Sequence, residues 1–128
     1  MTFKSHIDQV VLDTETWERS VAFQLEASEV VVCFARNDHL GIEIPYEFYG
    51  GAHKFLPDFV VRMKSGVRLL LEVKGLHGEK EEAKFQAAKR WVAAVNNWGR
   101  MGRWAFHVCR SPDMLKTEIE YLNSQPIA

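Results

Sequence analysis

The sequence predicts an α/β fold of three layers, with helices on both faces of a mixed β-sheet. Two observations carry this prediction. Apolar residues recur at helical spacing near both ends of the chain and over residues 79–98, whereas the runs between them are strand-like. A helix that connects two strands also implies that these two strands are parallel neighbours in one sheet. The expected order is helix, four strands, helix, strand, helix.

The composition is that of one soluble domain, because 47% of the 128 residues are hydrophobic and 26% are charged. We expect a single domain over residues 1–128, with an arm or linker at residues 1–12 and a frayed tail at residues 124–128. No signal peptide or membrane-spanning run occurs in the sequence, so we expect a cytoplasmic protein without a membrane partner. Cys33 and Cys109 lie in strand-like runs, and we expect both to be reduced core residues.

The first helix is expected to run to about Ala27, because Trp17, Val21 and Leu25 form one apolar stripe. Glu18 lies at the border of this stripe. The sequence leaves open whether it faces the interior or is a solvated edge residue. Three residues could cap the start of the helix, namely Asp13, Thr14 and Thr16.

Two strands are expected next, at residues 29–36 and 40–48. Pro45 lacks a backbone donor and therefore places the second strand at an edge or a bulge. Gly50-Gly51 then turns the chain into a strand that begins at Phe55. The apolar face of the second strand carries Ile42, Ile44, Tyr46 and Phe48.

A β-hairpin is expected where the polar residues 64–66 separate two runs rich in Val, Leu and Phe. A three-residue loop pairs Met63 with Val67 and places Asp58 opposite Glu72. A two-residue loop would mix polar and apolar residues on both faces, so we reject it. With the first register, one face is entirely apolar and carries Phe59, Val61, Met63, Val67, Leu69, Leu71 and Val73.

A helix over residues 79–98 and a strand over residues 103–110 follow the hairpin. Ser111-Pro112-Asp113 is typical of a helix start, with Ser as the cap and Pro at the first position. Leu115, Ile119 and Leu122 give this last helix its buried stripe. The stripe of the helix over residues 79–98 is expected to consist of Ala88, Trp91, Val92, Val95 and Trp98.

The predicted hairpin holds two carboxylates side by side, and Lys74 follows Glu72 on the same face. Like charges directly opposite each other repel, so this pair is costly unless a cation binds between Asp58 and Glu72. Carboxylate oxygens suit Mg²⁺ or Mn²⁺, which keep waters that a phosphate can replace. A lysine beside such a metal can orient or deprotonate an attacking water.

These residues resemble the PD-(D/E)XK nuclease signature: Pro57-Asp58, thirteen intervening residues, then Glu72-Val73-Lys74. Within that superfamily, residues 55–75, with residues 41–46 before them and residues 103–106 after them, are similar to the carboxy-terminal nuclease domain of type III restriction enzyme helicase subunits. The resemblance extends from about residue 17 to residue 115.

The resemblance implies a restriction-endonuclease-like core and a set of roles. Asp58 and Glu72 would bind the metal, together with the carbonyl of Val73, and Lys74 would assist hydrolysis. Glu18, on the first helix, would complete the metal site or its surroundings. The metal would be Mg²⁺, with Mn²⁺ as a substitute. The implied partners are DNA, a helicase or translocase domain or subunit, and a methyltransferase subunit.

Charge is segregated along the chain although the net charge is only −1. No Asp or Glu occurs from residue 83 to residue 112, and a basic region beside an acidic metal site suits a phosphate backbone. An incidental charge on a solvated helix and strand is the alternative, and for Lys84 it has equal weight. The expected DNA-binding residues are Lys84, Lys89, Arg90, Arg100 and Arg103.

The function that these features predict is a Mg²⁺-dependent deoxyribonuclease that cuts DNA internally. One site cuts one strand, so double-strand cleavage would need a homodimer or another partner. Three rivals remain open. They are a junction resolvase, transposase-end or repair nuclease of the same fold, a non-catalytic DNA-binding module, and a structural domain of an unrelated α/β protein.

Overall fold

The computed structural model describes residues 9–37, 40–73 and 78–125, with side chains of the first helix described from residue 16 onward. The chain forms three helices, six strands and a short 3₁₀ turn within these residues. In order they are α1 (Gln9–Ala27), β1 (Val31–Arg36), β2 (Ile44–Phe48), β3 (Gly51–Phe55), β4 (Phe59–Met63), β5 (Arg68–Val73), α2 (Glu79–Trp98), β6 (Trp104–Cys109), η2 (Pro112–Met114) and α3 (Leu115–Ser124).

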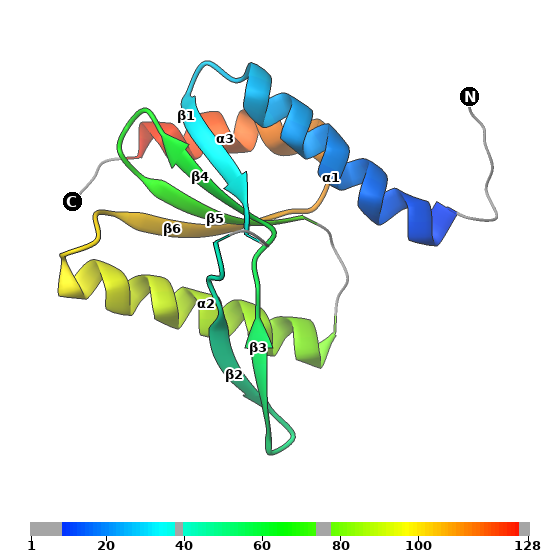
Figure 1. Ribbon diagram of the computed structural model, residues 1–128, viewed down its shortest axis with the longest axis vertical. Helices are drawn as coiled ribbons and strands as arrows, with labels where there is room; N and C mark the ends of the chain where they lie inside the picture. The colour runs from blue at the N-terminus through cyan, green and yellow to red at the C-terminus, as the bar shows by residue number, and fades with distance from the viewer. Residues whose placement is uncertain (1–8, 38–39, 74–77, 126–128) are drawn as a thin grey trace.

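Four strands form a mixed sheet in the order β1-β4-β5-β6. The β1–β4 and β4–β5 pairs are antiparallel, and β5–β6 is parallel across the α2 crossover, as predicted. Helices α1 and α3 lie on one face of this sheet and α2 lies on the other (Figure 1). The predicted mixed sheet with helices on both faces is therefore confirmed.

The hairpin of β4 and β5 has the predicted register. Phe59 pairs with Leu71 and Val61 with Leu69. The N–H of Met63 donates to the carbonyl of Val67 at 2.8 Å, which closes the three-residue loop. Gly66 has a φ of 98°, the left-handed conformation that this loop requires at its last position.

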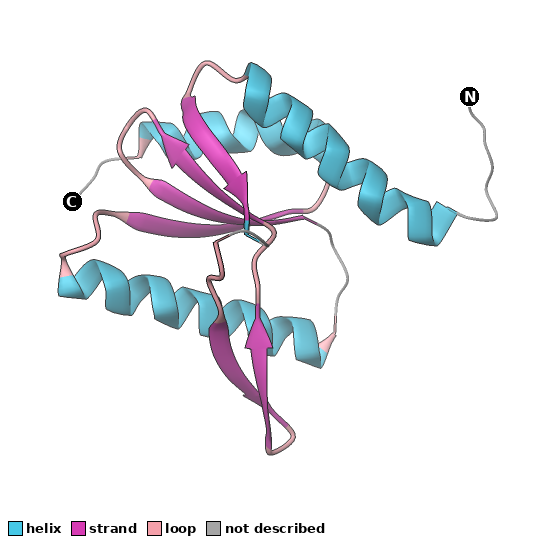
Figure 2. Cartoon of the chain, in the orientation of Figure 1, coloured by secondary structure: helices cyan, strands magenta, loops and turns pink. Residues whose placement is uncertain are grey.

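The predicted number of strands before α2 is wrong, because residues 51–55 form a strand of their own. This strand, β3, pairs with β2 in a separate two-stranded sheet. Tyr49 and Gly50 form the two-residue turn between them, with φ angles of 50° and 77°, so the turn is not at Gly50-Gly51 as expected. Figure 2 shows this ribbon projecting from the four-stranded sheet beside α2.

The strand predicted at residues 40–48 therefore lies outside the central sheet. In the central sheet, β1 pairs directly with β4 at the edge of the order β1-β4-β5-β6, which leaves β2 to pair with β3. The predicted alternation of β2 is nevertheless correct. Ile44 and Tyr46 are buried, and Ile42 and Phe48 pack against the same cluster, which also contains Leu70 and residues of α2.

Helix α1 begins at Gln9, four residues before Asp13, which is the first of the three residues predicted as possible caps. Residues 9–12 are therefore not an arm or linker, and Asp13, Thr14 and Thr16 lie inside the helix instead of capping it. No Gly or Pro occurs in residues 9–27, so nothing in the local sequence stops the helix from extending toward the N-terminus.

The buried faces lie largely where the periodicity placed them. Val21 and Leu25 of α1 and Leu115 and Ile119 of α3 pack on the apolar face of the hairpin. Helix α2 spans the predicted residues and ends at Gly99, which has the left-handed conformation of a helix C-cap. Trp98 was predicted in the buried stripe but is 59% exposed at the last position of the helix.

The C-terminal prediction is confirmed in part. Ser111 caps the 3₁₀ turn, and its hydroxyl accepts a hydrogen bond from the N–H of Asp113 at 3.3 Å. Ser124 still belongs to α3, so the frayed tail predicted from this residue begins too early; residues 126–128 lie outside the described part of the chain. Among the helices that the structure describes, none is long and apolar enough to cross a bilayer.

The two cysteines differ, because Cys109 is buried and Cys33 is exposed on β1. The prediction that both are core residues is therefore wrong for Cys33, since β1 is an edge strand and this position faces solvent. Burial, with a smaller contribution from the charge of Glu118, raises the pKa of the Cys109 thiol to about 11. The thiolate of Cys109 is consequently scarce at neutral and mildly alkaline pH.

We therefore expect a thiol reagent to modify one cysteine of the native protein rapidly and the second only after unfolding. The Cys33→Ser variant should lose the rapid reaction and keep the slow one. Ellman titration of both proteins, with and without denaturant, checks this. Rapid reaction of native Cys33→Ser would contradict the buried position of Cys109.

Candidate active site

Asp58 and Glu72 meet at the open end of the β4–β5 hairpin, as predicted. Each carboxylate binds the backbone of the opposite strand. Oδ2 of Asp58 accepts a hydrogen bond from the N–H of Val73 at 2.8 Å, and Oε1 of Glu72 accepts one from the N–H of Asp58 at 3.2 Å. These reciprocal hydrogen bonds fix the positions of both carboxylates relative to the sheet.

Pro57 explains why the ladder changes at this point. Met63 and Val67 form a hydrogen-bonded pair, and such pairs recur at every second position of an antiparallel ladder. By this alternation, Pro57 would donate to the carbonyl of Val73, but proline has no N–H. The carbonyl of Val73 therefore has no ladder donor at residue 57, and this carbonyl is the one that the resemblance implies as a metal ligand. The N–H of Val73, which the same alternation would pair with the carbonyl of Pro57, donates to Oδ2 of Asp58.

Glu72 is only 6% exposed, and it is one of two polar residues among the buried side chains of the described chain. Burying a carboxylate is costly unless hydrogen bonds and an opposite charge compensate for it. The hydrogen bond from the N–H of Asp58 is one such compensation. It also brings the Asp58 and Glu72 carboxylates to the same end of the hairpin.

Asn37 is the other buried polar residue, at 1% exposure. Its side chain forms two hydrogen bonds with Ile42, accepting from the N–H at 2.9 Å and donating to the carbonyl at 2.8 Å. Its own N–H donates to the carbonyl of Asp58 at 3.0 Å. Asn37 thus links the end of β1 and the segment before β2 to the backbone of Asp58.

Glu18 lies beside Asp58, and both residues line a hollow of about 220 Å³. Oε1 of Glu18 accepts a hydrogen bond from Nη1 of Arg36 at 2.9 Å. The structure therefore brings Glu18 to the site, as an ion-pair partner of Arg36. Its predicted role near a metal stays a prediction.

Among residues 9–37, 40–73 and 78–125, no three His, Cys, Asp or Glu side chains converge in a way that could hold a metal ion. Asp58 and Glu72 could supply two carboxylate groups to a cation, and the resemblance implies the carbonyl of Val73 as a third oxygen. This all-oxygen chemistry fits Mg²⁺ or Mn²⁺. Lys74, the predicted water-activating residue, lies outside the described residues.

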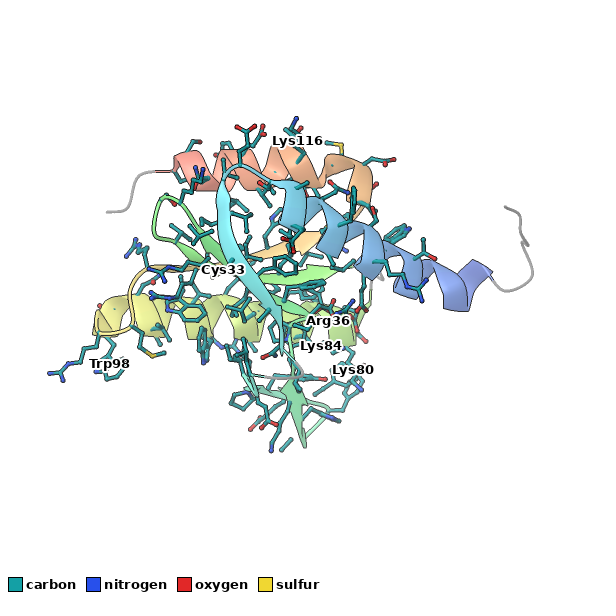
Figure 3. The ribbon with its side chains drawn as sticks, turned by 45° about the horizontal axis from the view of Figure 1, so that its top comes forward. Cys33, Arg36, Lys80, Lys84, Trp98 and Lys116 are labelled. Carbon is teal, nitrogen blue, oxygen red and sulfur yellow. The ribbon has the colours of Figure 1, made fainter. Side chains whose placement is uncertain are left out.

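The predicted DNA-binding residues are spread over two ends of the molecule. Lys84 lies 5.8 Å from the ring centroid of Phe55 and 3.1 Å from Oε2 of Glu81. Figure 3 shows Lys84 in the N-terminal half of α2 and Trp98 at the opposite end of this helix. Lys89 is exposed, and Arg90 lines a separate hollow between α2 and the β2–β3 ribbon.

Arg100 and Arg103 lie far from the carboxylates along the sheet. The carbonyl of Arg103 accepts a hydrogen bond from the N–H of Arg68 at 2.8 Å, at the start of β5. Glu72 lies near the end of the same strand, about 13 Å away at roughly 3.3 Å per residue. A bound DNA would have to extend along the sheet to reach both Arg103 and Glu72.

The sequence analysis missed Arg36 and Asn37 at this site. Both residues end the first strand, and the antiparallel pairing of β1 with β4 brings them beside Asp58. Two polar residues at the end of an apolar strand were a signal in the sequence. Their place beside Asp58 depends on the pairing of β1 with β4, which joins segments more than twenty residues apart.

The loss of Asn37 should destabilise the protein. In Asn37→Ala, the N–H and carbonyl of Ile42 lose their partners, so we expect the free energy of unfolding to fall by about 1–3 kcal/mol. Urea denaturation measures this change, and the exposed Asn97→Ala on α2 is the matched control. Equal stability of the two variants would show that water replaces both hydrogen bonds.

No protein-family model matches this chain, and the searches of curated proteins and of solved structures found no significant match.

Proposed function

We propose that this chain is a metal-dependent endonuclease that hydrolyses DNA phosphodiester bonds, on a restriction-endonuclease-like fold. One observation carries the proposal. The reciprocal hydrogen bonds of Asp58 and Glu72 hold two carboxylates together at the end of the hairpin. The resemblance of Pro57-Asp58 and Glu72-Val73-Lys74 to the PD-(D/E)XK signature supports the same function.

In this proposal Asp58, Glu72 and the carbonyl of Val73 hold Mg²⁺ or Mn²⁺, and Glu18 lies outside them. When bound, the metal supplies Lewis-acid stabilisation of the charge that develops on the phosphate. Lys74 orients the attacking water and accepts its proton. The hydrogen bonds from the backbone of Asp58 and Val73 hold the carboxylates in place before DNA binds, which limits reorganisation during the reaction.

One such site cuts one strand, so double-strand cleavage requires a second copy of this chain or a different nuclease. The resemblance to type III restriction enzymes supports a helicase or translocase domain or subunit as the partner that delivers DNA. It also supports association with a methyltransferase subunit.

The proposal is tested with supercoiled plasmid, incubated with the purified protein in Mg²⁺, in Mn²⁺ or in EDTA. We expect nicked or linear plasmid with either metal and intact plasmid in EDTA. Glu120→Gln, which changes an exposed glutamate of α3, should cleave like the wild type. Intact plasmid in both metals, across a range of protein concentrations, would contradict the proposed activity.

A non-catalytic DNA-binding module is the second candidate, and one observation favours it. Each carboxylate already holds a backbone N–H, which is a structural role that needs no metal. Retained binding of labelled duplex DNA without cleavage in either metal would support this function.

A panel of linear, nicked and branched DNA separates a restriction-type nuclease from a junction resolvase, a transposase-end nuclease or a repair nuclease.

A further inference from the structure

Arg36 is a cation held directly beside the candidate active site. The pairing of β1 with β4 places Arg36 opposite Phe59, one residue from Asp58. Its guanidinium carbon lies 5.3 Å from the ring centroid of Phe59, a cation–π contact that restricts the side chain. Figure 3 shows Arg36 at the end of β1.

The guanidinium of Arg36 faces the hollow that contains Asp58. Arginine has five N–H donors in a planar fork that pairs with two oxygens of one phosphate. The hydrogen bond to Glu18 uses Nη1 of the fork, and the side chain of Arg36 is 42% exposed. Among the described residues that line the hollow, Arg36 is the single cation; these residues are Glu18, Arg36, Asn37, Leu56, Pro57 and Asp58.

Two carboxylates lie near Arg36 among the described residues that line the hollow, namely Glu18 and Asp58. Glu18, which is hydrogen-bonded to Arg36, competes with any other anion for this guanidinium. The ion pair between Glu18 and Arg36 is partly exposed, and pairs of this kind shift equilibria only a few-fold. Neutralising one carboxylate would therefore suffice to release Arg36 for another anion.

We propose that Arg36 binds a backbone phosphate of DNA next to Asp58, and that Glu18 masks it until the carboxylates are neutralised. The ligand is taken to be DNA, and in this respect the inference rests on the proposed function. It assigns to the Glu18–Arg36 pair a role in substrate binding that is separate from the chemical step. DNA binding at this position then depends on whether Glu18 is paired with Arg36.

The test is a double-mutant cycle in EDTA, where cleavage does not occur. Fluorescence anisotropy of a labelled DNA duplex, over a series of salt concentrations, is measured for wild type, Glu18→Gln, Arg36→Gln and the double variant. We expect Glu18→Gln to tighten binding by about two- to five-fold, the range of an exposed ion pair. Adding Arg36→Gln should remove this gain and reduce the log–log salt slope by about 0.9.

Two controls separate this role from general charge effects. Glu26→Gln changes an exposed glutamate of the same helix, and Arg62→Gln changes an exposed arginine on β4. The effect of Glu26→Gln on DNA binding should be the same with and without Arg36→Gln. The effect of Arg62→Gln should be the same with and without Glu18→Gln. Arg36→Lys keeps the charge but not the fork, so in the Glu18→Gln background it should recover only part of the gain. Thermal melts establish that each variant is folded.

An absent gain in Glu18→Gln, or an equal gain with and without Arg36, would overturn the inference. These outcomes are independent of the nuclease proposal. Coupling without plasmid cleavage would leave a phosphate site in a DNA-binding module. Cleavage without coupling would leave the nuclease and remove the role of Arg36.

Discussion

Asp58→Asn and Glu72→Gln are each expected to abolish DNA cleavage while leaving the protein folded. The amide side chains keep an oxygen that can accept the hydrogen bond from Val73 or from Asp58, but they lose the negative charge that holds a divalent cation. Loss of metal-derived stabilisation is worth several kcal/mol in the transition state, and about 1.4 kcal/mol changes the rate tenfold.

The stability of these variants reflects two opposing effects. A neutral acceptor weakens the charge-assisted hydrogen bond by about 1 kcal/mol, whereas removing one charge relieves repulsion of some tenths of a kcal/mol. We therefore expect unfolding free energies within about 1 kcal/mol of wild type in EDTA. The Ala variants lose the acceptor as well and should be less stable than Asn or Gln.

Thermal melts with and without Mg²⁺ or Mn²⁺ complete this test. The wild type should gain stability from metal, by about 2.7 kcal/mol at a hundredfold excess over Kd, and both amide variants should lose most of this gain. Wild-type cleavage by either variant would remove that carboxylate from the mechanism. Strong destabilisation of both would show that the carboxylates act mainly as structural acceptors.

Lys74→Ala is expected to lose cleavage while it retains stabilisation by metal. Lys74 follows Glu72 by two positions, so the period-2 rule predicts it on the same face as Glu72, and it is the proposed proton acceptor. Removing a positioned proton-transfer group slows a reaction by about 10²- to 10⁴-fold. Single-turnover cleavage and metal-dependent melts measure the two properties separately.

Two further variants define what Lys74 does. Lys80→Ala removes an exposed lysine of α2 and should cleave like the wild type. Lys74→Arg keeps a positive charge but cannot accept a proton in the physiological range. Recovery of cleavage in Lys74→Arg would assign the residue to charge stabilisation. Wild-type rates in Lys74→Ala would exclude it from the reaction.

Local features of this chain were predictable because neighbouring residues determine them. The hairpin register follows from the period-2 alternation and from the conformation that Gly66 alone adopts without strain. The bounds of α2 follow from its apolar period and from Gly99 at its end. The juxtaposition of Asp58 and Glu72 is a consequence of that register, so the central pair of the candidate site was predicted from the sequence.

The errors concern pairings between distant segments. Nothing in residues 40–48 indicates that β1 would take the place beside β4, so that β2 would pair with β3 instead. The exposure of Cys33 and of Trp98 likewise depends on where the sheet and the helix layers end. Which strands pair and which positions the layers cover depend on the whole fold, so no short stretch of sequence predicts these features.

Contacts within a few residues or across one short loop specify the hairpin, its two carboxylates and the alternation of helices with strands, so these features were readable in the sequence. Three others required the folded chain: Arg36 and Asn37 reach Asp58, Glu18 pairs with Arg36, and Arg100 and Arg103 lie at the far end of the sheet. Strand pairing and layer packing bring these residues together by burial of the whole core, which depends on every segment at once.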